Sequence, residues 1–176
     1  MLRIRIAQEA DLAPIQQLIA ASFSDDENKA IMNVVAALAQ ENTTPPIKSF
    51  IAESGDQLVG YVAYSPVFTG LDGISGYILA PLAVLPTYQK QGVGTKLIEA
   101  GSEVLVAYGV DVLLVYGDPD YYGRFGFTEE IARSFVPPYP LEYPFGWLGM
   151  RLSKTEIPNH PIKFECAAAL SKPEIW

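Results

Sequence analysis

The 176-residue sequence predicts a mixed α/β domain of the α+β class, with a mixed sheet and helices on both of its sides. Its segments follow the order strand, two helices, hairpin, strand, helix, strand, short helix and strand. Hydrophobic residues make up 49% of the chain and charged residues 18%, which is typical of a globular protein. The run Val112 to Tyr116 is almost entirely apolar, as expected for a central strand buried on both faces. We expect one domain over residues 1–176.

The first elements are predicted from alternation and capping signals. Leucine and isoleucine alternate with arginine over residues 2–6, which predicts a half-buried strand. Asp11 is expected to cap a helix that runs to about Phe23. Ser24 and Glu27 have the spacing of a capping box, so a second helix is expected to begin there.

A hairpin and a third strand follow these helices. The segments Lys48–Glu53 and Leu58–Val67 are strand-like, and Gly55 and Asp56 between them form a turn pair suited to a hairpin. A glycine-rich loop then precedes a strand over Tyr77–Leu85.

A glycine turn connects this third strand to the next helix. Pro86 ends the strand, and Gly92 and Gly94 lead into an amphipathic helix that is expected to end at Gly109. The first N–H groups of a helix lack internal partners, and glycines let an anion approach the bare backbone. The turn therefore predicts a phosphate-binding site. The apolar residues at helical spacing are Val93, Leu97, Ala100, Gly101, Val104, Leu105 and Tyr108.

Spacing separates three phosphate-binding motifs. The P-loop pattern GxxxxGK[ST] fails because no glycine stands five residues before Gly94. The dinucleotide pattern GxGxxG fails because Leu97 stands at its third glycine. The pattern [QR]xxGx[GA] fits Gln89, Gly92 and Gly94. A helix that starts after a glycine pair for structural reasons alone explains the same residues, so this motif by itself leaves both interpretations open.

A second motif follows the helix, in the stretch VLLVYGDPDYYGRFGF. It ends in a short helical turn that Asp118 is expected to cap and that carries Tyr122 before Gly126 and Phe127. Together the two motifs resemble the GNAT superfamily of N-acetyltransferases, in a bacterial branch with a DPxYYGRFGF-type motif. The resemblance implies a GNAT-like fold, a central mixed, mostly antiparallel sheet splayed between two parallel strands, with helices on both faces. It also implies acetyl-CoA as the co-substrate.

The resemblance assigns the cofactor to the end of the third strand and the turn after it. Pro81 fits the interruption at which the family's splayed strand frees its backbone groups. The Val84 N–H would polarise the thioester carbonyl and stabilise the oxyanion that forms as the amine adds. Lys90, Lys96 and Arg124 are the cations expected nearby. The implied cofactor-binding residues are Leu82, Ala83, Val84, Gln89, Lys90, Gln91, Gly92, Val93, Gly94, Thr95 and Phe125.

For the reaction, the resemblance implies direct attack by a primary amine of a small molecule or a protein on acetyl-CoA. Tyr122 holds the family's position for a general acid that protonates the leaving thiolate, whereas Tyr121 is expected to pack. The general base is unassigned, because residues 74–84 contain no Asp or Glu. Glu53 and Asp72 are weaker candidates for that role.

The end of the chain is rich in proline and aromatic residues. The segment Val136–Trp147 is predicted either to lie over a cleft or to connect elements at the surface. Trp147–Ser153 is expected to form the last strand, and residues 160–167 a further edge element.

Net charge and amino-acid composition limit the kinds of partner that we expect for this chain. The net charge of −8 argues against nucleic-acid binding, and no apolar run reaches the ~18 residues of a membrane span. A lone cysteine, Cys166, and an N-terminus that turns acidic early predict a cytoplasmic protein. His160 and Cys166 show no nucleophile pattern, and no His/Cys cluster predicts a metal site. GNAT-like proteins often dimerise, so a homodimer is compatible with the resemblance.

Three alternatives to an enzyme stay open at this point. A non-catalytic acyl-CoA-binding sensor would share the fold and bind CoA without turnover. Another phosphate binder, such as a nucleotide-binding protein, would bind ATP as well as CoA. An interaction scaffold would use the segment Val136–Trp147 as its contact surface and bind no nucleotide.

Overall fold

The computed structural model describes all of residues 1–176 and divides into two compact units. The first unit comprises Met1–Tyr64 and Ala80–Glu103, and the second comprises Ser65–Leu79 and Val104–Trp176. Strand β3 (Gln57–Val67), strand β4 (Gly76–Val84) and helix α3 (Val93–Ala107) each have residues in both units.

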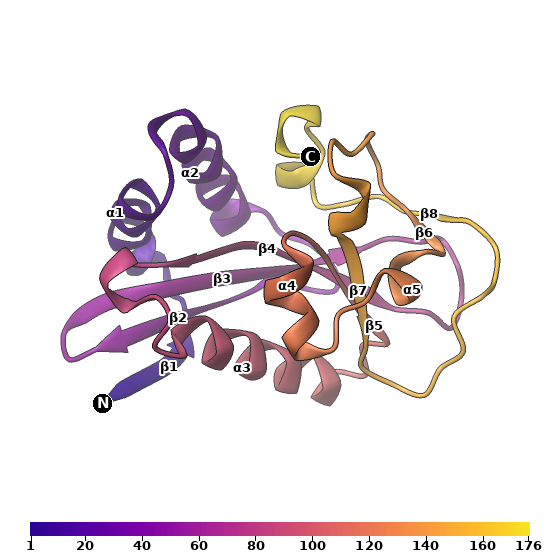
Figure 1. Cartoon of the computed structure of the whole chain (residues 1–176), viewed down its shortest axis with the longest axis horizontal. Helices are drawn as coiled ribbons and strands as arrows, with labels where there is room; N and C mark the ends of the chain where they lie inside the picture. Colours follow the sequence, from indigo (N-terminus) through magenta and orange to yellow (C-terminus); the bar gives the residue numbers. More distant parts are fainter. The chain divides into compact units, whose positions relative to one another are not determined.

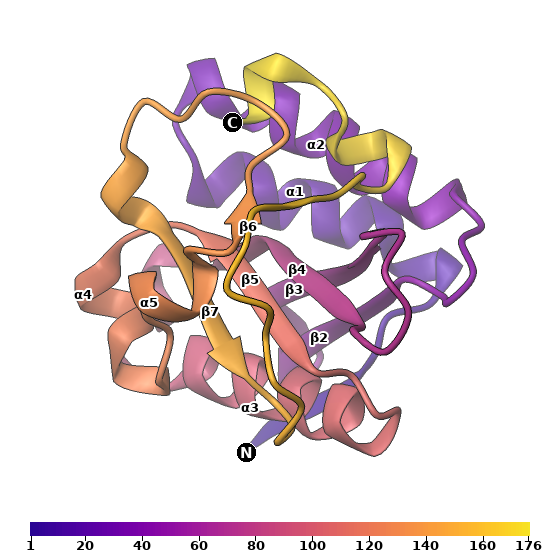
Figure 2. The ribbon, with the colours of Figure 1, turned by 90° about the vertical axis from the view of Figure 1, so that its right-hand side faces the viewer.

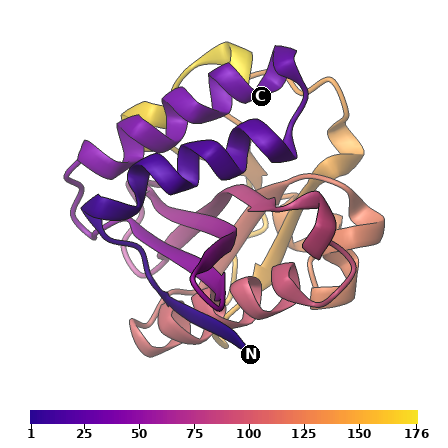
Figure 3. The same ribbon diagram turned by 90° about the vertical axis from the view of Figure 1, so that its left-hand side faces the viewer.

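The first unit is a layered arrangement of strands and helices. Helices α1 and α2 lie side by side over one face of its strands, and α3 lies on the opposite face (Figures 1 and 3). β1 pairs with β2, and β2 with β3, in antiparallel register. The predicted hairpin is confirmed, with Gly55 at a φ of 62° in its turn. The remaining elements of this unit are β1 (Leu2–Ile6), α1 (Leu12–Ser22), α2 (Asp25–Gln40) and β2 (Lys48–Ser54).

The second unit is built around strand β5, which is buried along most of its length. The first residues of β4, Gly76–Ile78, pair with Val112–Leu114 of β5 in parallel register. That pairing stops at Ile78, whereas β4 continues to Val84. On its other side β5 pairs with β7 in antiparallel register (Figure 2), and β6 pairs with β8 in parallel register (Figure 1). The elements of this unit are β5 (Val112–Tyr116), α4 (Pro119–Tyr122), α5 (Glu129–Ala132), β6 (Phe135–Val136), β7 (Trp147–Arg151) and β8 (Ile162–Lys163).

The strand order of the main sheet is β1-β2-β3-β4-β5-β7, and β6 and β8 form a separate two-stranded sheet. The predicted fold class is therefore confirmed, as a mostly antiparallel sheet with a parallel β4–β5 pair. The predicted last strand corresponds to β7, and β8 lies within the predicted edge element.

Several local predictions were wrong in detail. Tyr108 was assigned to the buried face of α3, but it follows the end of the helix and is 66% exposed, while Ile98 is buried instead. Asp11 does not cap α1 with its side chain, because its carboxylate binds Arg5. Ser24 does occupy the N-cap position of α2, although its hydroxyl donates to the Glu27 carboxylate (2.8 Å) rather than accepting from the backbone.

Two glycines let α3 pack closely against β3. A Cβ atom at Gly60 of β3 would lie 2.9 Å from side-chain carbons of both Val93 and Leu97 of α3. A Cβ atom at Gly101 of α3 would lie 2.1 Å from the Tyr64 ring of β3, and the Tyr64 hydroxyl donates to the Leu97 carbonyl at 3.1 Å. Helix α3, which follows the glycine turn, therefore contacts β3 so closely at these two positions that an added methyl group would not fit.

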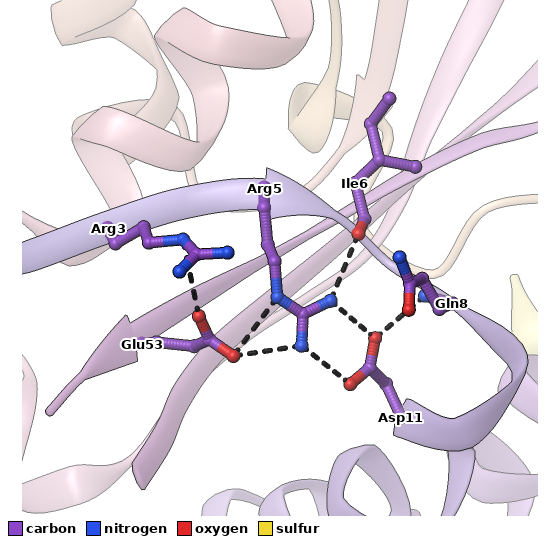
Figure 4. Close-up of polar contacts among 6 residues, drawn as sticks. All are labelled: Arg3, Arg5, Ile6, Gln8, Asp11 and Glu53. Atoms are coloured by element: carbon purple, nitrogen blue, oxygen red, sulfur yellow. Dashed lines mark hydrogen bonds and ion pairs between the residues drawn. The ribbon is translucent and has the colours of Figure 1, made fainter. Parts of the chain in front are cut away.

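A partly buried arginine cluster joins β1, β2 and the start of α1 (Figure 4). The Arg5 guanidinium donates to both oxygens of Asp11 at 2.7 and 2.8 Å, and to the Glu53 carboxylate at 2.8 and 3.1 Å. Asp11 also accepts from the Gln8 backbone N–H at 2.7 Å. The hydrogen bonds from Arg5 hold the pKa of Asp11 below its usual value, although partial burial acts in the opposite direction. The Glu53 carboxylate is therefore engaged in an ion pair with Arg5.

We predict that Gly101→Ala lowers the free energy of unfolding by about 1–3 kcal/mol, because the added methyl collides with the buried Tyr64 ring. The matched control is Gly123→Ala, where φ is −57° and a Cβ atom would meet nothing within 4 Å. The control should be neutral or slightly stabilising. Urea denaturation of both variants measures the difference, and equal stabilities would contradict the tight seating of α3.

We predict that Asp11→Asn lowers the free energy of unfolding by about 2 kcal/mol at pH 7. Because the folded-state pKa of Asp11 is lowered, its stabilisation is complete above the unfolded-state pKa of about 4 and is lost as the pH falls through the folded-state value. The difference in unfolding free energy between Asp11→Asn and the wild type should therefore shrink towards zero at about pH 2. Thermal denaturation across this pH range tests the prediction.

The control for this series is Asp56→Asn, an exposed position in the hairpin turn that should change stability by less than about 0.5 kcal/mol at any pH. A pH-independent loss in Asp11→Asn would show that the carboxylate charge is not the source of the stabilisation.

Candidate active site

The turn between β4 and α3 presents a run of free backbone donors. Lys90 has a φ of 59° and Gly92 a φ of 82°, so two residues just before the helix have left-handed backbone conformations. The first helical hydrogen bond runs from the Lys96 N–H to the Gly92 carbonyl at 3.0 Å. None of the N–H groups of residues 90–95 donates to another backbone group. Such a concave run of N–H groups at a helix N-terminus suits an anion.

The side chains of this turn hold its shape. The Gln89 amide donates to the Val84 carbonyl at 3.1 Å, and the Gln91 amide donates to the Thr87 carbonyl at 2.7 Å. Lys90 is exposed and, unlike most non-glycine residues, stays in the left-handed region, which costs about 1 kcal/mol. The two predicted glutamines thus brace the backbone, and the free donors are main-chain N–H groups.

The end of β4 is fixed from three directions. The Val84 carbonyl accepts from the Ser22 hydroxyl at 3.2 Å as well as from Gln89, and the next N–H, that of Leu85, donates to Val59 at 2.9 Å. Ser22 lies at the end of α1 and was missed by the sequence analysis, because no local pattern links it to a strand 62 residues away.

In the second unit, the motif around Tyr122 forms a compact aromatic turn. The Asp118 carboxylate accepts from the Asp120 N–H at 2.9 Å, which confirms the predicted cap. The Tyr122 ring packs edge-on against Tyr121 (5.0 Å between centroids) and Phe127 (5.7 Å), and it fills the space beside Gly117. Burial raises the pKa of Tyr122, and the neighbouring Tyr121 and Asp118 add to the increase. The phenol therefore remains protonated at neutral pH.

Two further residues of this motif stack together. The Tyr121 ring lies 5.5 Å from that of Phe125, and the Arg124 guanidinium lies over Tyr121 at 4.7 Å and over Phe125 at 5.4 Å. The prediction that Tyr121 packs is confirmed. Arg124, which is expected as a cation near the cofactor, stacks on these rings and donates to the Tyr121 carbonyl at 3.2 Å.

The model of the Acetyltransferase (GNAT) family matches residues 12–127, a span that includes both the glycine turn and Tyr122. The chain belongs to this family. Among curated relatives, the "Uncharacterized N-acetyltransferase YjhQ" of Escherichia coli K12 is 32% identical over 153 residues, covering 84% of this chain and 83% of YjhQ.

Solved GNAT structures match this chain over nearly its full length. The YhbS N-acetyltransferase of Escherichia coli, crystallised in complex with CoA, has a TM-score of 0.82 at 25% identity, covering 97% of this chain and 92% of YhbS. A GNAT family acetyltransferase from Brucella melitensis, crystallised in complex with acetyl-CoA, has a TM-score of 0.74 at 29% identity, covering 97% and 98% of the two chains.

The other groups considered as a general base or a nucleophile in this GNAT chain have surroundings that do not favour those roles. Glu53 is engaged by Arg5, and Asp72 lies exposed on the loop after β3. Burial raises the pKa of Cys166 to about 12, so its thiol stays protonated, and the exposed His160 contacts the Pro161 carbonyl. Neither forms a nucleophile pair.

Two further observations concern metal ligands and membrane spans. No group of three or more His, Cys, Asp or Glu side chains is arranged to hold a metal ion. None of the helices has both the length and the apolar character that a membrane crossing requires.

Proposed function

We propose that this GNAT chain transfers the acetyl group of acetyl-CoA to a primary amine of a small molecule or a protein. The observation that carries the proposal is the run of free N–H groups at residues 90–95, at the end of a strand whose last carbonyl is held in place. The CoA and acetyl-CoA bound in the YhbS and Brucella melitensis structures support the choice of cofactor.

The cofactor would be bound mainly by backbone. The pyrophosphate would accept hydrogen bonds from the turn and from the first turn of α3, where the helix dipole favours negative charge. The pantetheine arm would pair with the backbone of Leu82, Ala83 and Val84. In this proposal the half-buried Phe125 packs along the cofactor, and Thr95 adds a hydroxyl to the phosphate site. Gln89 would contribute by holding the turn, through its bond to Val84.

The reaction would proceed by direct attack. The amine lone pair forms a bond to the thioester carbonyl carbon, and the carbonyl oxygen becomes negative and accepts from the Val84 N–H. The C–S bond then breaks, and the CoA thiolate takes the proton of the Tyr122 hydroxyl. The raised pKa of Tyr122 keeps the phenol protonated until the thiolate forms, although the same rise makes it a weaker acid. The amine's own proton leaves to a base that remains unassigned.

Three finer statements remain predictions from the sequence: a cytoplasmic location, a homodimer, and a single domain over residues 1–176. The family is shared by proteins with many acceptors, so the acceptor depends on the walls of the site rather than on the fold.

The first test of the function is calorimetric titration of the protein with acetyl-CoA, CoA and ATP. We expect binding of both CoA forms and negligible binding of ATP. Gly92→Glu should abolish binding, because it places a carboxylate beside the proposed pyrophosphate site. Equal binding of CoA and ATP would contradict the assignment of the turn, and CoA binding without turnover on any amine would favour a sensor.

The control for Gly92→Glu is Gly109→Glu. Both glycines have positive φ, 82° and 74°, and a Cβ atom at either meets nothing within 4 Å, so both variants introduce similar backbone strain and the same charge. Gly109 follows the opposite end of α3, more than about 20 Å along the helix from the turn. CoA binding should survive in Gly109→Glu, and its loss there would mean that strain alone explains the first variant.

We predict that Tyr122→Phe lowers kcat by about 10²-fold or more, while the Kd for acetyl-CoA stays nearly unchanged. The neighbouring variant Tyr121→Phe is the control for a one-residue error in the assignment and should retain activity. Steady-state kinetics and calorimetry on both variants provide the measurement. A proportional loss of turnover and cofactor binding in Tyr122→Phe would remove the general-acid role.

A further inference from the structure

A pocket of about 350 Å³ lies in the first unit, between the start of α1, the end of α2 and the loop that leads to β2. Its apolar walls come from two helices and the loop, and include Leu12, Ile15, Val35, Leu38 and Ile47. At the strand side it reaches Ser49 of β2 and Tyr61 of β3. The volume falls within the range of small-molecule sites, which is roughly 300–1,000 Å³.

Polar residues make up half of the pocket lining, and the uncharged ones are Gln8, Gln40, Asn42, Thr43, Ser49 and Tyr61. Tyr61 is only 3% exposed, its hydroxyl is hydrogen-bonded with the Ser49 side chain, and burial raises the pKa of the hydroxyl to about 12, so this group is neutral. The charged residues that line the pocket are Glu9 and Glu41, and no Lys, Arg or His lines it. The Glu9 side chain makes no hydrogen bond or ion pair within the chain.

We propose that this pocket is a second ligand site, which binds a small protonated amine with an apolar, ring-sized body. The apolar walls take the body, and the exposed Glu9 carboxylate favours a cation over a neutral or anionic head group. A cavity of about 150 Å³ is enough for benzene, so this pocket has room for a ring with a short aminoalkyl chain. The amine would be a bound effector rather than the acetyl acceptor.

This pocket lies near the start of α1, away from the end of β4 where the cofactor is proposed to bind. Leu12 and Ile15, near the start of α1, line the pocket, whereas Ser22 at the end of the helix donates to the Val84 carbonyl. Ten residues of helix span about 15 Å, so an amine in the pocket lies well away from Val84. The inference does not depend on the proposed function, because it concerns binding and not turnover.

The test is calorimetric titration of the full chain with 2-phenylethylamine, 2-phenylethanol and 3-phenylpropanoate, which share one body and differ in head-group charge. We expect the amine to bind most tightly and the carboxylate least. The amine should bind equally well with and without saturating CoA. No amine binding, equal binding of the three probes, or competition between the amine and CoA would overturn the proposal.

Two pairs of variants locate the site. Ala39→Trp fills the pocket from an exposed position on α2 and should abolish binding of the amine, whereas Ala13→Trp, exposed on α1 outside the pocket, should not. Glu9→Gln should weaken amine binding by about threefold to fivefold and leave binding of the alcohol unchanged. Glu99→Gln, exposed on α3, is its control. Unchanged amine affinity in both Ala39→Trp and Glu9→Gln would place the amine elsewhere and refute the site.

Discussion

The close packing of α3 on β3 is the constraint on which the glycine turn between β4 and α3 depends. The Leu85 N–H, at the start of the turn, bonds to Val59, and Val93, at its end, packs against the neighbouring Gly60. Two adjacent residues of one buried strand therefore hold both ends of the turn. The N–H groups between them have a fixed position before any ligand arrives, and such preorganisation reduces the entropy that binding must overcome.

Chemistry in this protein is expected to rely on the main chain and a single phenol. The N–H groups of the turn, the Val84 N–H and the Tyr122 hydroxyl are all neutral, and the surrounding contacts set their positions or their pKa. The charged groups are engaged otherwise. Arg5, Asp11 and Glu53 stabilise the first unit, and Arg124 stacks on aromatic rings. The proposed chemistry therefore has its sequence signal in the glycine spacing of the turn rather than in charged residues.

The sequence predicted those features that short segments encode. The hairpin turn, the glycine turn, the buried strand β5 and the Asp118 cap each depend on neighbouring residues, and all of these elements form as expected. Contacts between distant segments were not predictable, among them Ser22 with Val84 and Arg5 with Glu53. Asp11 shows the same limit, because a residue with the right type for a cap found a stronger partner in a neighbouring strand. The pocket between α1 and α2 likewise has no signature in sequence.

The use of backbone donors in the turn has a consequence for the response to ionic strength. A site built from lysines attracts an anion through net charge, and salt weakens that attraction. Here the free donors are N–H dipoles, with the exposed Lys90 and Lys96 nearby, in a chain of net charge −8 whose overall field repels a polyanion. Added salt screens this repulsion more than it weakens short hydrogen bonds. The proposed cofactor should therefore lose less affinity in concentrated salt than it would at a site built from lysines alone.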